Sequence, residues 1–97
     1  NAIVQNLGNQ LFAIVNAMPN PFTDEFKLQV FSNENQASEI TVMNAMGQAI
    51  FQQEVNLTEG LNTIPVNLDS DASGILMVKM TPFHPYLRQI RVMKVRD

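Results

Sequence analysis

The chain is 97 residues long, enough for one domain, and has a net charge of −3. It has no cysteine, which excludes disulfides and thiolate zinc sites, and its apolar runs are far shorter than the roughly 20 residues of a membrane-spanning helix. No signal peptide opens the chain, and because it begins with Asn1 we expect it to be a piece of a longer protein.

The charges are unevenly distributed along the chain. Residues 1–78 hold eight acidic side chains and one basic, whereas residues 79–97 hold five basic side chains and one acidic. A basic end on an acidic body suits docking to an acidic partner or an anionic membrane surface, but basic residues also protect an edge strand from unwanted pairing. Charge alone leaves both interpretations open. Nucleic acid binding is disfavoured, because the acidic body would repel phosphates.

The first predicted element is an apolar strand, LFAIV, at residues 11–15. It follows residues 1–10, a segment that includes Asn6, Gly8 and Asn9. This segment has no pattern that would anchor it in a core, so we expect it to be a linker.

The sequence MPNPF (18–22) interrupts the strand pattern with a stiff segment. Each proline fixes φ near −65°, lacks a backbone donor and disfavours a helical conformation in the residue before it. We therefore predict a proline corner at residues 19–22, with the Asn20 amide satisfying backbone donors that would otherwise be orphaned at the corner and the Phe22 ring buried as an anchor. We also interpret the corner as the boundary between linker and rigid domain.

Six further strands are predicted from the alternation of apolar and polar residues. They are FKLQVF (26–31), EITVMN (39–44), AIFQQEV (49–55), NTIPVNL (62–68), ILMVKM (75–80) and LRQIRVMKV (87–95). The side chains expected to face inward are Phe26, Leu28, Val30, Ile40, Val42, Ile64, Val66, Leu68, Leu76, Val78 and Met80. The alternation is blurred in the third and sixth of these strands, so no inward face is assigned there. The pattern predicts an all-β fold, a seven-stranded immunoglobulin-like antiparallel β-sandwich.

Turn residues separate the predicted strands. Turns are expected at NAMG (44–47), TEG (58–60), SDASG (70–74) and TPFHP (81–85). Gly47 is expected to adopt a left-handed conformation beside a β-bulge. The polar stretch SNENQAS (32–38) is predicted to be a mobile surface loop, and Pro65, which has no ladder donor, predicts an edge strand.

The chain offers few groups for catalysis or metal binding. His84 is the single histidine, and without a second histidine or a cysteine it lacks partners for a nucleophilic triad or a zinc site. Asp24 with Glu25, and Asp69 with Asp71, are compatible with calcium but are more typical of turn capping. We predict no catalytic residue, no metal site and no cofactor.

The order of these features resembles a known family. The proline corner is followed by DEFKLQV (24–30), ITVMNAMGQAIF (40–51), LTEGLNTIPVNL (57–68), ASGILMVKM (72–80) and a basic final strand. Over residues 11–97 this resembles the type A C-terminal sorting domain of the type IX secretion system of Bacteroidota. The matching positions are Pro19, Asn20, Pro21, Phe22, Gly47, Gly60, Asn62 and Gly74. The chain departs from the family at Leu76, where tyrosine is common, and at PFHPYLRQ (82–89), which replaces a shorter hairpin.

The resemblance implies a sorting signal without enzymatic activity. Such domains lie at the C-terminus of exported proteins, are recognised by the outer-membrane translocon and are usually cleaved by a surface sortase in the linker before the first strand. This implies a linker in residues 1–10 and a sorting domain in residues 11–97. The implied location is the periplasm in transit, then the outer membrane, the cell surface or the medium. The implied partners are the translocon, the sortase and an N-terminal cargo domain, without nucleic acid or membrane insertion.

The final strand is predicted to carry recognition. We expect its backbone to add to a partner's sheet, with Arg91, Lys94, Val95 and Arg96 as recognition residues. The alternative is a non-catalytic adhesion or carbohydrate-binding module, for which Phe83 and Tyr86 would form a small aromatic patch. A structural spacer of the same fold also fits the strand pattern.

Overall fold

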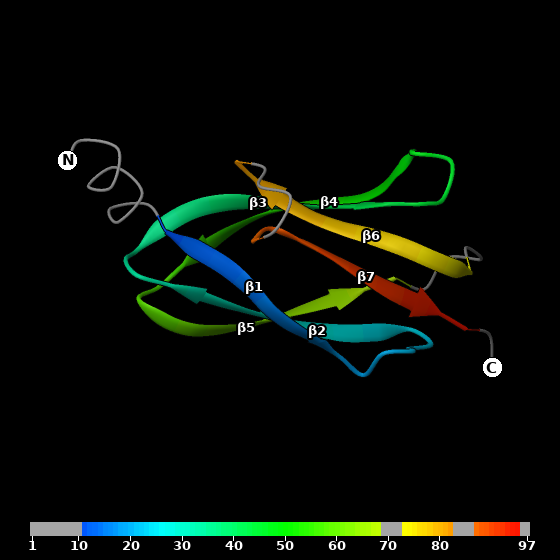
Figure 1. Cartoon of the computed structure of the whole chain (residues 1–97), viewed down its shortest axis with the longest axis horizontal. Coiled ribbons are helices and arrows are strands. Elements are labelled where there is room, and N and C mark those ends of the chain that lie inside the picture. The colour runs from blue at the N-terminus through cyan, green and yellow to red at the C-terminus, as the bar shows by residue number, and fades with distance from the viewer. Residues whose placement is uncertain (1–10, 69–72, 83–86, 96–97) are drawn as a thin grey trace.

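The computed structural model describes residues 11–68, 73–82 and 87–95 (Figure 1). Its strands are β1 (Phe12–Met18), β2 (Glu25–Ser32), β3 (Gln36–Met43), β4 (Ala49–Leu57), β5 (Gly60–Asn67), β6 (Gly74–Thr81) and β7 (Gln89–Lys94). They form two sheets, one with the order β1-β2-β5 and one with the order β4-β3-β6-β7. Every neighbouring pair is antiparallel, which confirms the predicted antiparallel β-sandwich.

The core lies between the facing sides of the two sheets, where the predicted alternation holds. Phe26, Leu28 and Val30 of β2 are fully buried, as are Ile40 and Val42 of β3. The predicted inward residues of β5 and β6 join the same cluster, with Ile64 only partly buried. Burying one such side chain contributes about 1.5–3 kcal/mol, so this cluster dominates the stability of the domain.

The two strands without an assigned inward face are both edge strands. In β4, an edge strand of the four-stranded sheet, Leu57 is the one buried residue. In β7, the inward positions are Val92 and Lys94, so a basic residue occupies a place where an apolar one would continue the pattern. β5 is the edge strand that Pro65 predicted.

The prediction of a mobile surface loop at residues 32–38 is wrong. β2 continues to Ser32 and β3 begins at Gln36, so only residues 33–35 connect the two strands. Ser32 is fully buried, and its hydroxyl donates to the Glu34 carbonyl at 2.6 Å and accepts from the Gln36 amide at 2.8 Å. Ser38 is also buried and donates to the Thr81 carbonyl. Side-chain hydrogen bonds therefore replace the missing apolar anchor.

The glycines predicted at turns take the conformations that turns require. Gly47, Gly60 and Gly74 have φ of 83°, 105° and 99°, which side chains with a Cβ rarely adopt. Beside Gly47, the β3–β4 pairing shifts register between Val42 and Met43, which confirms the expected irregularity. At Gly60, the Asn62 amide donates to the Thr58 carbonyl at 2.9 Å and its oxygen accepts from the Thr58 N–H at 2.9 Å. The glycine and the asparagine thus form one turn unit.

Candidate functional site

The proline corner carries the chain from one sheet to the edge of the other. β1 pairs with β2 along its length, with an irregularity between Ile14 and Asn16, and the Ile14 N–H donates to the Leu87 carbonyl at 2.7 Å. Leu87 lies just before β7, and β1 and β7 are in contact (Figure 1). After β1, the chain turns through the corner and Phe22 forms an isolated parallel bridge with Lys94.

The corner occupies the outer edge of β7 with four hydrogen bonds. The Phe22 N–H donates to the Met93 carbonyl at 2.9 Å, and the Val95 N–H donates to the Phe22 carbonyl at 2.8 Å. The Met93 N–H donates to the Asn20 side-chain oxygen at 2.9 Å, and the Asn20 amide donates to the Arg91 carbonyl at 3.4 Å. The Asn20 amide thus bonds to β7, whereas the sequence predicted that it would satisfy donors at the corner itself. We call this arrangement the edge seal.

Phe22 anchors the edge seal in the core, as predicted. Its side chain is 2% exposed, and its ring meets the Phe26 ring edge-on with centroids 4.8 Å apart. The interpretation of the corner as the boundary of the rigid domain is wrong, because β1 precedes it and is already a paired strand. The corner is an internal part of the sandwich.

The structure revises the expected role of β7. At residues 91–95, where a partner's strand was expected to add, the corner already hydrogen-bonds to the backbone of Arg91, Met93 and Val95. Arg91 and Val95 are exposed, whereas the Lys94 side chain is 6% exposed and points into the domain. Arg96 lies outside the described residues. Of the predicted recognition residues that the structure describes, Arg91 and Val95 are therefore the ones with exposed side chains.

A groove with a volume of about 310 Å³ lies beside the edge seal, on the outer face of the four-stranded sheet. The corner provides Asn20 and Pro21 on one side. The strands provide the remaining lining residues, Ile75, Arg91, Val92 and Met93. The groove is thus formed by two segments that are far apart in the sequence, the proline corner and the basic final strand.

Arg88 is a structural residue that the sequence analysis did not find. It is 9% exposed, and its guanidinium lies over the Phe12 ring, 3.8 Å from the centroid. Its Nε donates to the Phe12 carbonyl at 3.1 Å and its Nη1 to the Pro82 carbonyl at 2.9 Å. Burial lowers the pKa of the Arg88 guanidinium, since the interior disfavours the charged form. In the sequence, its even spacing from Val92 places both residues on one face of the strand, but the blurred alternation does not show that this face is inward.

Several residues considered for chemistry lie outside the described residues. They are His84, Asp69, Asp71, Phe83 and Tyr86. Within the described ranges, no group of three or more histidine, cysteine, aspartate or glutamate residues is arranged to hold a metal ion. The same ranges contain no helix long and apolar enough to cross a membrane.

Asn20→Ala should lower the free energy of unfolding by about 1–2 kcal/mol, because the Met93 N–H and the Arg91 carbonyl each lose a partner. Asn20→Asp keeps the acceptor for Met93 and should cost less. Hydrogen exchange at the Met93 amide should accelerate about tenfold in the alanine variant and stay near the wild-type rate in the aspartate variant. Unchanged Met93 protection in Asn20→Ala would contradict the edge seal.

Comparison with solved structures identifies the same fold in parts of larger enzymes. A β-glucosidase from Erythrobacter marinus matches 89% of this chain with a TM-score of 0.53 and 13% identity, over 16% of the enzyme's own length. A GH3 β-glucosidase from Bifidobacterium adolescentis matches 88% of this chain with a TM-score of 0.53 and 17% identity, over 17% of its length. At these identities the likeness shows the fold alone, and the chain spans about one sixth of either enzyme.

Comparison of the sequence with protein families is more specific. No curated protein matches the chain. The model of the secretion system C-terminal sorting domain matches residues 16–84, which include the proline corner and all three turn glycines. The match covers more than half of the chain and ends before β7. The chain therefore belongs to the family of C-terminal sorting domains of type IX secretion.

Proposed function

We propose that residues 11–97 are the sorting signal of a larger exported protein, recognised in the folded state by the type IX translocon at the outer membrane. Residues 1–10 serve as the linker in which a surface sortase separates cargo from signal. The domain has no catalytic activity of its own; it passes through the periplasm and acts at the outer membrane.

The edge seal is the observation that supports recognition of a folded domain. The corner and β7 are separated by some 70 residues in sequence, and the Asn20–Arg91 and Asn20–Met93 hydrogen bonds join them. An unfolded chain does not hold these two segments together, so a receptor that contacts both reads the folded state. A receptor of this kind reads the signal independently of the cargo that precedes it.

A reporter fusion tests the proposal. Residues 1–97 are placed after a reporter that carries its own signal peptide, in a host with a type IX secretion system. We expect the reporter at the cell surface or in the medium, measured by surface labelling and fractionation. Accumulation of the reporter in the periplasm, while the fused domain is folded, would contradict the proposed function.

The structure also determines which truncation is informative. Removal of residues 94–97 deletes Lys94, which pairs with Gly74, and Val95, which donates to Phe22. Such a variant loses part of the edge seal. If it is not exported, the cause can be a loss of folding or a loss of recognition, and the experiment does not distinguish the two. Removal of residues 96 and 97 alone leaves every described contact of β7 in place. Comparison of these two truncations separates a requirement for the terminal residues from a requirement for the fold.

A further inference from the structure

The outer face of β6 and β7 carries apolar side chains at its groove end. Ile75 and Met93 face each other across the two strands and are 50% and 40% exposed. In the next row, Met43 faces Met77 and Met77 faces Arg91. Directly opposed residues have Cβ atoms about 4.5–5.5 Å apart, so these rows form one continuous surface. Flexible methionine side chains on such a surface adapt to varied aliphatic partners.

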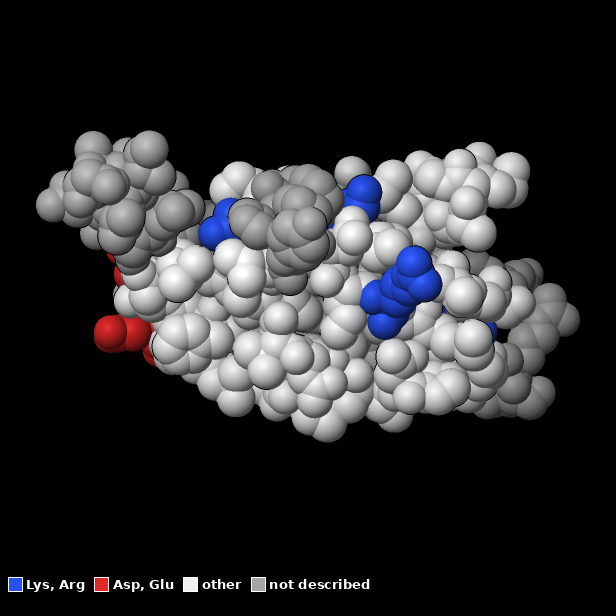
Figure 2. All heavy atoms as spheres, in the orientation of Figure 1, with Lys and Arg blue, Asp and Glu red and all other residues white. Residues whose placement is uncertain are grey.

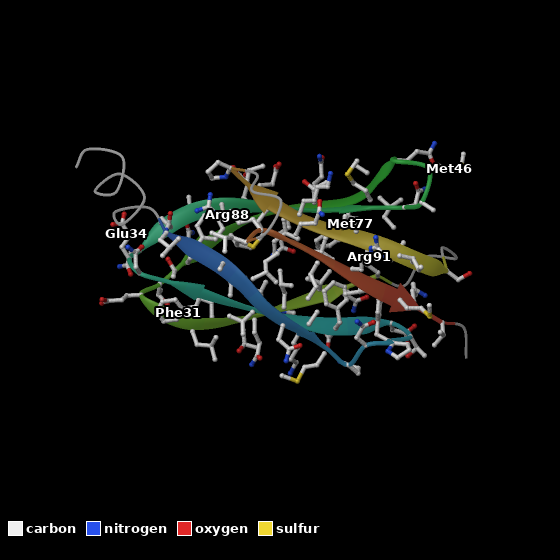
Figure 3. All side chains as sticks on the ribbon, viewed as in Figure 1. Phe31, Glu34, Met46, Met77, Arg88 and Arg91 are labelled. Carbon is white, nitrogen blue, oxygen red and sulfur yellow. The ribbon has the colours of Figure 1, made fainter. Side chains whose placement is uncertain are left out.

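Arg91 adds one charge to this apolar surface. It lies exposed beside Met77 (Figure 3), and the described lining of the groove contains no acidic residue. A guanidinium flanked by apolar side chains is weakly hydrated and binds a carboxylate in two-pronged geometry. The groove therefore combines places for aliphatic side chains with a place for a carboxylate.

The charge distribution over this face supports an acidic partner. Figure 2 shows basic side chains amid uncharged surface over β6 and β7, whereas the acidic side chains visible on this face lie at the opposite end. Glu34 marks that acidic end and Arg91 the basic one (Figure 3). On this face, an acidic partner is attracted to Arg91 and repelled by the acidic side chains at the Glu34 end, which sets its orientation.

We propose that the groove between the proline corner and β7 binds an extended, acidic segment of a partner protein, with aliphatic side chains on Ile75 and Met93 and a carboxylate on Arg91. This inference rests on the proposed function and names the chemistry of the partner that reads the signal. The segment binds by its side chains and not by strand addition, since the edge seal occupies the neighbouring edge of β7. An anionic lipid surface fits less well, because the described lining of the groove holds one basic residue, Arg91, and lipid headgroups are typically bound by clusters of several.

Titration of the full, isotope-labelled 97-residue chain with a synthetic peptide tests the groove directly. The probe is an acetylated and amidated hexapeptide of alternating leucine and glutamate, and its control has glutamine in place of glutamate. We expect saturable amide shifts at Ile75, Arg91 and Met93 with the acidic peptide, and about fivefold weaker binding of the control. Dispersed shifts without saturation, or equal affinity for both peptides, would overturn the proposal.

Three variants test whether peptide binding and the preference for the acidic peptide depend on the residues of the groove. Arg91→Gln should abolish the fivefold preference for the acidic peptide, because the preference comes from that one charge. Lys27→Gln removes one basic charge from the exposed face of β2, which does not line the groove, and should leave the preference intact. Ile75→Asp should weaken both peptides at least tenfold without unfolding the domain, since the side chain is half exposed. Equal effects of Arg91→Gln and Lys27→Gln, or binding to phosphatidylglycerol vesicles with no binding of peptide, would also overturn the proposal.

Export of the same variants separates this inference from the proposed function. If the wild-type fusion reaches the surface and the folded Ile75→Asp and Arg91→Gln fusions accumulate in the periplasm, both stand. If all three reach the surface equally, the groove is not the recognition site, while the sorting function stands. If the wild-type fusion itself remains in the periplasm, the proposed function is wrong, and so is the role of the groove as its recognition site.

Discussion

Phe22→Ala should lower the free energy of unfolding by about 3–5 kcal/mol, the usual cost of removing a buried aromatic ring. The side chain is 2% exposed and packs edge-on against Phe26, so the substitution leaves a cavity at the joint between the corner and the core. For a domain of this size, the melting temperature should fall by about 15 °C or more. Urea denaturation gives the free energy, and thermal unfolding followed by circular dichroism gives the temperature.

Phe31→Ala is the matched control for this loss. Phe31 lies on β2 like Phe26, but its side chain faces outward and is 49% exposed (Figure 3). Its removal leaves no interior cavity, so it should cost roughly 1 kcal/mol or less. If Phe22→Ala and Phe31→Ala destabilise the domain equally, Phe22 is not the anchor of the edge seal. Phe22→Ala should also impair export of the reporter fusion in proportion to the fraction of domain unfolded.

Arg88→Met should lower the free energy of unfolding by about 2–4 kcal/mol, although methionine fills a similar volume. The substitution leaves the Phe12 and Pro82 carbonyls without the donors that satisfy them, and each such loss costs about 1–3 kcal/mol. It also removes the guanidinium from the Phe12 ring. Because burial already opposes the charge of Arg88, these contacts must together offset its desolvation.

Two further substitutions determine whether the stability lost in Arg88→Met comes from the geometry of the guanidinium or from its charge. Arg88→Lys keeps the charge but not the fork of donors that reaches both carbonyls, so it should recover only part of the lost stability. Arg91→Met removes an exposed arginine from the same strand and should change stability by less than about 0.5 kcal/mol. Urea denaturation of the three variants gives the ranking. Equal stability of Arg88→Met and Arg91→Met would show that the buried contacts of Arg88 contribute nothing.

The inward orientation of the Arg88 and Lys94 side chains could not be predicted from the sequence. Both occupy even positions with Val92, which is buried, so the two-residue period places them on the inward face. Basic residues at such positions blur the alternation that would reveal the face. Arg88 is compatible with burial because the Phe12 carbonyl and ring lie opposite it, and that contact spans 76 residues of sequence.

Local patterns were sufficient for much of the sandwich. The period of two identified the inward residues of β2, β3, β5 and β6, because strand geometry alone places alternate side chains on one face. Pro65 indicated an edge strand through its missing donor, and Gly60 indicated a turn through its freedom at positive φ. The order of the motifs along the chain was enough to suggest the family to which it belongs.

The path of the proline corner required the folded molecule. The local sequence predicted a bend, a buried Phe22 and an Asn20 bonded within the corner, but it contains no information on which strand the bend meets. That strand is β7, whose Arg91 and Met93 lie 71 and 73 residues from Asn20 in the chain. Backbone periodicity acts over neighbouring residues, whereas the pairing of distant edges depends on how the two sheets pack. For this reason, only the tertiary structure reveals the edge seal, the buried Lys94 and the groove beside Arg91.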